Sequence, residues 1–82
     1  MSSNINRGST EKYLDDAAIT TKIKAKYLAD EIIRSFDIHV VTEDAKVTLS
    51  GNVPNSRVLN HAIKIAKNTV GVSEVISKIA LV

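Results

Sequence analysis

The apolar residues of this 82-residue chain switch three times between a helical spacing and strand alternation, and this order constrains the fold most. Ile19, Ile23 and Tyr27 recur every four residues, which places them on one stripe of a helix. Asp15 or Asp16 can cap this helix, because either carboxylate can accept from the free N–H groups of the first turn. The spacing therefore predicts a first helix that begins at this acidic pair.

Strand alternation starts at Phe36. Phe36, Ile38 and Val40 alternate with polar residues, which predicts a half-buried strand. After a polar segment at 43–46, a second alternating run predicts the other strand of an antiparallel hairpin, with Val47, Leu49, Gly51 and Val53 on one face. Gly51 interrupts the apolar side chains of this run, which indicates a bulge or the close approach of another backbone segment.

The second helix has the clearest pattern in the sequence. Pro54 ends the preceding strand, and Asn55 or Ser56 can cap the helix. Gly71 stands where a left-handed C′ residue closes a helix. The apolar residues before it share one arc of a helical wheel, namely Val58, Leu59, Ala62, Ile63, Ile65, Ala66 and Val70.

A third alternating run, residues 75–82, predicts the last strand. Val75, Ile79 and Leu81 share one face of this run, and Ile76 and Val82 on the other face are apolar too. This strand is therefore expected to lie centrally or to be partly covered on both faces. The order α-β-β-α-β predicts an α+β fold, a three-stranded mixed sheet with both helices packed on one face. Residues 1–14 are polar and are expected to form a flexible tail before a domain at 15–82.

The polar arc of the second helix is the best candidate site. Arg57, His61, Lys64 and Lys67 share this arc, and no acidic residue of the helix interrupts it. An ordinary solvated helix face explains this pattern. Electrostatic docking to anionic phospholipid explains it as well, because each Lys or Arg near an anionic surface contributes about 1 kcal/mol.

Several classes of function lack the residues that they need. The chain has no cysteine, so disulfides and thiolate metal sites are excluded. His39 and His61 fall on different predicted elements, and helix capping explains the Asp15-Asp16 pair, so we predict no catalytic residue, no metal and no cofactor. With one Phe, two Tyr, no Trp and a net charge of +2, nucleic acid is not an expected partner. No apolar run is long enough for a transmembrane helix, and residues 1–14 lack the apolar region of a secretory signal.

Five short motifs, taken in order, resemble a BON domain, the module named for bacterial OsmY and nodulation proteins. The resemblance runs from about Asp15 to Val82, and the Leu-Ser-Gly-x-Val and Gly-Val-x-x-Val motifs contain Gly51 and Gly71. Where the family often has Gly in the hairpin, this chain has Asp44-Ala45-Lys46. The motifs are Asp16-x-x-Ile19-x-x-x-Ile23, Ile38-x-Val40, Val47-Thr48-Leu49-Ser50-Gly51-x-Val53, Ala62-x-x-x-Ala66 and Gly71-Val72-x-x-Val75-x-x-x-Ile79-x-Leu81.

The resemblance implies a non-enzymatic module of the bacterial envelope, associated with osmotic stress, that binds phospholipid or a protein partner at the membrane surface. The implied location is the periplasm, with the cytoplasm as the alternative because this chain shows no signal. Two other functions stay open. One is a protein–protein assembly module without lipid affinity that pairs through a sheet edge or the first helix, and the other is a cation-binding sensor. The oligomeric state is left open.

Overall fold

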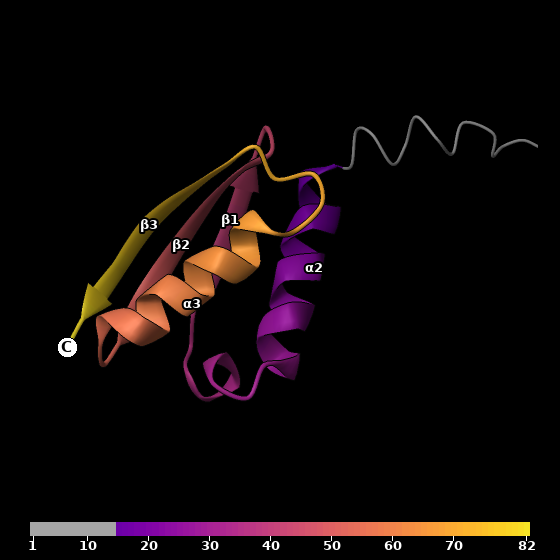
Figure 1. The fold of residues 1–82 in the computed structure, drawn as a ribbon. Coiled ribbons are helices and arrows are strands. Elements are labelled where there is room, and N and C mark those ends of the chain that lie inside the picture. Colours follow the sequence, from indigo (N-terminus) through magenta and orange to yellow (C-terminus); the bar gives the residue numbers. More distant parts are fainter. Residues whose placement is uncertain (1–14) are drawn as a thin grey trace, which may run out of the picture.

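Within residues 15–82, two helices and three strands follow one another in the predicted order α-β-β-α-β, which confirms the α+β fold (Figure 1). The computed structural model describes residues 15–82, and the predicted flexible tail at 1–14 lies outside this range. A 3-10 turn that the sequence pattern did not predict separates the first helix from the sheet. The elements are α2 (Asp16–Ala29), η1 (Ile33–Ser35), β1 (His39–Glu43), β2 (Lys46–Val53), α3 (Ser56–Lys67) and β3 (Glu74–Leu81).

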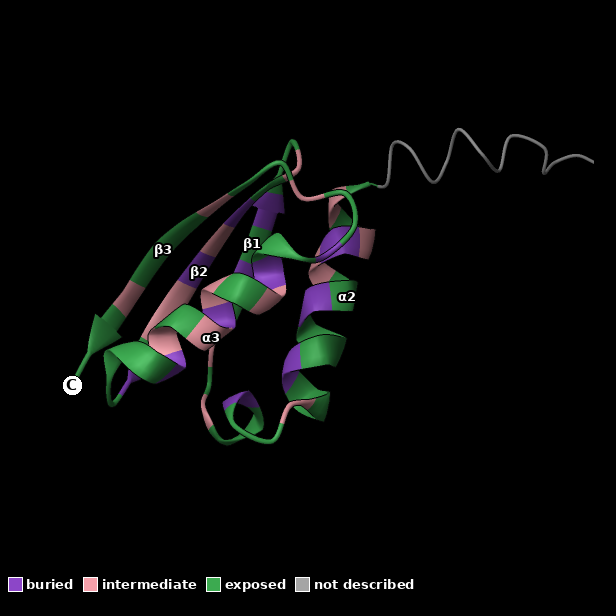
Figure 2. Ribbon diagram, in the orientation of Figure 1, coloured by how far each residue is buried: buried purple, intermediate pink, exposed green. Residues whose placement is uncertain are grey.

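The sheet has the order β1-β2-β3, with β1 and β2 antiparallel and β2 and β3 parallel. Both helices cover one face of it, and the buried residues gather where α2 and α3 face the sheet (Figures 1 and 2). The expectation that the last strand is central, or covered on both faces, is wrong. β3 is an edge strand with no buried residue, because β2 takes the central position between its hairpin partner and the crossover strand.

The first helix follows its predicted stripe. Asp15 caps α2 by accepting a hydrogen bond from the Ala18 N–H at 2.8 Å, and Ile19, Ile23 and Tyr27 are its buried residues. The helix ends at Ala29. Neither helix within residues 15–82 combines the length and apolar composition that a membrane span requires.

The first strand begins later than its alternation predicts. Phe36 ends η1, where its N–H donates to the Ile33 carbonyl at 2.9 Å, and β1 begins only at His39. Phe36 and Ile38 pack against the core from the connecting segment. Their alternation reflects contact with the core in an extended loop rather than strand pairing, because the β1–β2 ladder ends at the His39–Ser50 pair.

The hairpin turn consists of Asp44 and Ala45, whose φ angles are 51° and 67°. Two positive φ angles define a type I′ turn, which normally selects Gly or Asn because other L-residues are strained there. The Asp16 carboxylate compensates for this strain by accepting hydrogen bonds from the Asp44 and Ala45 N–H groups at 2.8 and 3.0 Å. The first turn of α2 therefore supports a turn that lacks glycine.

Gly51 marks a close backbone approach, as its position in the alternating run predicts. Its φ is 135°, and a Cβ at this position would lie 2.7 Å from the Asp37 carbonyl oxygen. The β1–β2 ladder ends at the preceding His39–Ser50 pair, whereas the β2–β3 ladder continues through Gly51, which is paired to Ile79. Of the two predicted explanations, close approach is the one confirmed.

The second helix is shorter than its apolar arc. Asn55 caps α3 by accepting from the Val58 N–H at 3.0 Å, and the helix ends at Lys67. Val70, predicted on the apolar arc, is 66% exposed beyond the helix. Gly71 has the predicted positive φ, 98°, but it is not the C′ residue. It occupies the third position of a turn that the Val72 N–H closes on the Thr69 carbonyl at 3.2 Å.

Candidate functional site

The exposed face of α3 carries three of the four residues predicted to dock on anionic phospholipid. α3 buries Val58, Ala62 and Ala66 against the sheet and α2, so the opposite side of the helix faces solvent. Arg57, Lys64 and Lys67 are all exposed on it, and α3 contains no acidic residue. We call these three residues the α3 basic face.

His61, the fourth predicted residue, contacts an acid. Its Nε2 lies 2.7 Å from Oδ2 of Asp30, the residue that caps the C-terminus of α2, and its side chain is 33% exposed. The expectation that no acid interrupts the arc therefore holds for the helix itself but is wrong for the folded surface at His61. Sequence reasoning missed this contact because it joins two elements 31 residues apart.

Asp30 organises the connection between α2 and η1. Besides its contact with His61, its carboxylate accepts hydrogen bonds from the Ile32 and Ile33 N–H groups at 2.9 and 3.0 Å. The hydrogen bond with His61 lowers the pKa of Asp30, and the Ile33 N–H lowers it further. The charged carboxylate thus holds together the end of α2, the start of η1 and α3.

This depressed pKa predicts how stability depends on pH. A carboxylate whose folded pKa lies below its unfolded value, about 3.9, adds stability above that value and loses it as the pH falls through the folded pKa. Asp30→Asn should therefore lower the free energy of unfolding at pH 7 and make the loss below about pH 4 shallower. Urea denaturation between about pH 2 and 7 measures both effects. Glu31→Gln neutralises the adjacent exposed carboxylate as a control, and an equal acid dependence in both variants would contradict the role of Asp30.

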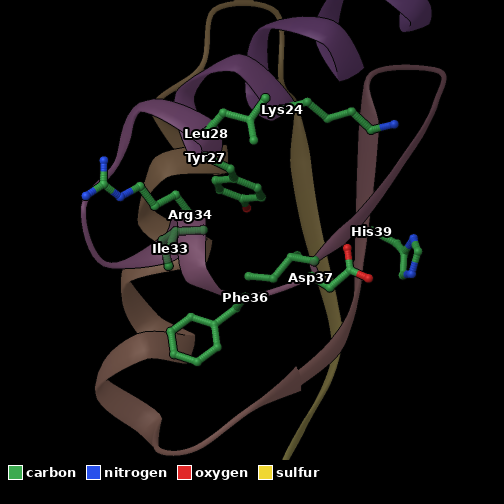
Figure 3. Close-up of a pocket in the computed structure, with 9 residues that line it drawn as sticks. Lys24, Tyr27, Leu28, Ile33, Arg34, Phe36, Asp37 and His39 are labelled. Atoms are coloured by element: carbon green, nitrogen blue, oxygen red, sulfur yellow. The ribbon is translucent and has the colours of Figure 1, made fainter.

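A hollow of about 350 Å³ lies beside the C-terminal half of α2 (Figure 3). The Tyr27 ring forms part of its wall, and Lys24 and Arg34 extend outward on opposite sides of it in this view. The sequence analysis did not find this hollow, because η1 and the segment 36–38 form much of it and were not predicted to do so. Its lining residues are Lys24, Tyr27, Leu28, Ile33, Arg34, Phe36, Asp37, Ile38 and His39.

The hydroxyl of Tyr27 is committed to the fold. It donates a hydrogen bond to the Ala62 carbonyl at 2.8 Å, and burial raises the pKa of Tyr27 above its usual value. A buried phenol held in this way links α2 to α3 and does not serve as an acid or base at neutral pH. The hollow offers apolar surface with Lys24, Arg34 and the Asp37 carboxylate among its lining residues.

The two histidines lie apart in the fold. His39 is an exposed residue at the start of the edge strand β1, whereas His61 lies on α3 beside Asp30. Within residues 15–82, no three His, Cys, Asp or Glu side chains are grouped so that they could hold a metal ion. A cation-sensing role therefore has no ligand cluster in this range to support it.

Similarity to known proteins identifies the family. Osmotically-inducible protein Y of Escherichia coli is 42% identical over 67 residues, which cover 82% of this chain and 33% of that protein. Outer membrane lipoprotein DolP of Haemophilus influenzae is 38% identical over 61 residues, which cover 74% of this chain and 31% of that protein. The chain thus spans about a third of the length of these relatives.

A solved structure shares the fold. CdsD, a structural protein of the type III secretion system of Chlamydia trachomatis, superposes with a TM-score of 0.69 at 15% identity, over 87% of this chain and 34% of that chain. This likeness concerns the fold alone. The family model for the BON domain matches residues 15–82, the whole range that the structure describes. The chain belongs to the BON domain family.

Proposed function

We propose that this chain is a non-enzymatic envelope module that docks on anionic phospholipid through the α3 basic face, Arg57, Lys64 and Lys67. The observation that carries the proposal is the exposure of all three cations on a helix with no acidic residue. The relatives support the envelope setting, since one is osmotically inducible and another is an outer membrane lipoprotein. The compartment that we propose is the periplasm.

The proposed binding is peripheral and electrostatic. The apolar residues of α3 pack against the sheet and α2, so the helix cannot insert them into a bilayer without unfolding the domain. Three cations at about 1 kcal/mol each supply reversible attraction to anionic lipid rather than anchoring. The attraction should weaken as salt rises, because exposed charges are screened over about 8 Å at physiological ionic strength.

Reversing the α3 basic face should abolish this binding. In the triple variant Arg57→Glu, Lys64→Glu and Lys67→Glu, attraction of about 3 kcal/mol is replaced by repulsion, so affinity for vesicles should fall at least about 100-fold. Co-sedimentation with phosphatidylglycerol vesicles at low salt measures the loss. Circular dichroism should show an unchanged fold, because all three side chains are exposed.

A matched control separates this face from net charge. Lys22→Glu, Lys24→Glu and Lys46→Glu make the same change of charge at exposed positions on α2 and β2. This control should retain most of the vesicle binding of the unmodified protein. Equal loss in both triple variants would show a non-specific charge effect, and absence of binding by the unmodified protein at low salt would overturn the proposal.

A further inference from the structure

β3 presents an unpaired backbone edge. It is the outermost strand in Figure 1, and no element within residues 15–82 pairs with its outer side. The Val82 N–H donates to the Val53 carbonyl at 2.9 Å, so even-numbered positions point their backbone groups toward β2. Because these groups alternate along a parallel strand, Val75, Ser77, Ile79 and Leu81 point theirs outward.

One hydrogen bond supports this assignment. The Ile79 N–H donates to the Ser77 hydroxyl oxygen at 3.3 Å, a local hydrogen bond from a donor that no neighbouring strand accepts within the described residues. The edge is long and unbroken, since β3 is eight residues long and contains no proline, and its charged side chains are Glu74 and Lys78. Ile76 and Leu81 are 39% and 53% exposed along it. Such an edge is a template for strand addition.

The charges of β3 select a second copy of β3 as the partner. Glu74, Ile76 and Lys78 lie on the sheet face that the helices leave uncovered, and all three are exposed. In an antiparallel pair with its two-fold axis at Ile76, Glu74 of each copy lies opposite Lys78 of the other, and Ile76 lies opposite itself. Neither Glu74 nor Lys78 has an ion-pair partner within residues 15–82. The ion pair in that range joins His61 and Asp30. We propose that two copies of this chain pair in this way.

The backbone pattern fits this register. Val75 of one copy lies opposite Ser77 of the other, and both point their N–H and C=O groups outward, as a hydrogen-bonded antiparallel pair requires. The charged pairs then occupy the non-hydrogen-bonded positions, where facing side chains are closest. A register shifted by two residues for each copy, centred on Lys78 or Glu74, places like charges opposite each other. The strand thus favours one register.

Pairing through β3 creates one continuous sheet of six strands. The two-fold axis is perpendicular to the sheet, so the helices of both copies cover the same face. On the proposed lipid function, both α3 basic faces would then point to one side, and the pair would dock with two sets of cations instead of one.

A charge swap tests the pairing independently of lipid. Sedimentation equilibrium from about 1 to about 500 µM should show a monomer–dimer equilibrium that depends on concentration. Lys78→Glu should weaken the dimer at least about tenfold, because it sets two carboxylates opposite each other at both ends of the pair. The double variant Glu74→Lys with Lys78→Glu should restore dimerisation to within about threefold of the original.

The controls make each outcome decisive. Lys22→Glu makes the same change of charge on α2, which packs against β1 and α3 rather than along the paired edge, and should leave the equilibrium unchanged. All the substituted side chains are exposed, so circular dichroism should show the same fold throughout. A monomer at every concentration, or a swapped variant no stronger than Lys78→Glu alone, would overturn the proposal while leaving the lipid proposal intact.

Discussion

Gly51→Ala is expected to lower the free energy of unfolding by at least about 3 kcal/mol, from backbone strain and overpacking together. The new methyl group would lie 2.7 Å from the Asp37 carbonyl oxygen, a backbone atom of the segment that leads into β1. At a φ of 135° the alanine backbone is strained as well. For a domain of this size the melting temperature should fall by at least about 12 °C, which a thermal melt measures.

Gly71→Ala is the matched control for this substitution. Gly71 also has a positive φ, 98°, but it lies in an exposed turn after α3. Alanine there should incur mainly the backbone cost, about 1–2 kcal/mol. If the two alanine variants lose equal stability, the contact between Gly51 and Asp37 contributes nothing beyond the backbone angle.

Ile23→Ala should cost about 2–5 kcal/mol, because it removes a fully buried side chain and leaves a cavity. Ile23 has no exposed surface and lies in the core cluster formed by α2, α3 and the covered face of the sheet. Small domains have about 5–15 kcal/mol of stability in total, so this one substitution should leave a large fraction unfolded on mild heating. Urea titration followed by circular dichroism gives the change directly.

Leu28→Ala tests the same helix on its other side. Leu28 is 73% exposed, so its loss should change the free energy of unfolding by no more than about 0.5 kcal/mol. A large loss at Leu28, or a small one at Ile23, would contradict the way in which α2 packs on the sheet.

Local signals in the sequence predicted the helices and the hairpin. Asp15 and Asn55 cap the helices in the structure because a short polar side chain before an apolar stripe is enough to satisfy the first N–H groups. The buried stripe of α2 could also be predicted from local sequence, because the spacing of its apolar residues depends only on helix geometry. The same helix geometry predicts that the three cations of α3 lie on its exposed face.

Contacts between distant segments could not be predicted in this way. The order of strands in the sheet depends on which edge the crossover reaches, so the apolar character of residues 75–82 gave the wrong position for β3. The approach of Asp30 to His61 depends on how α2 lies against α3. η1 is three residues long and carries no period of its own, so the apolar alternation around Phe36 was interpreted as a strand.

The hydrogen bonds at the backbone of Ala45 have a consequence for the order of folding as well as for the stability of the hairpin. The Ala45 N–H is bound by Asp16, and its carbonyl accepts from the N–H and the hydroxyl of Ser73 at 2.8 and 3.1 Å. These partners lie 29 and 28 residues away along the chain. A two-stranded hairpin is marginal in isolation, and this one has a strained turn whose support comes from both distant partners. The hairpin is therefore not expected to nucleate folding, because its turn gains this support only after α2 and the segment before β3 have docked.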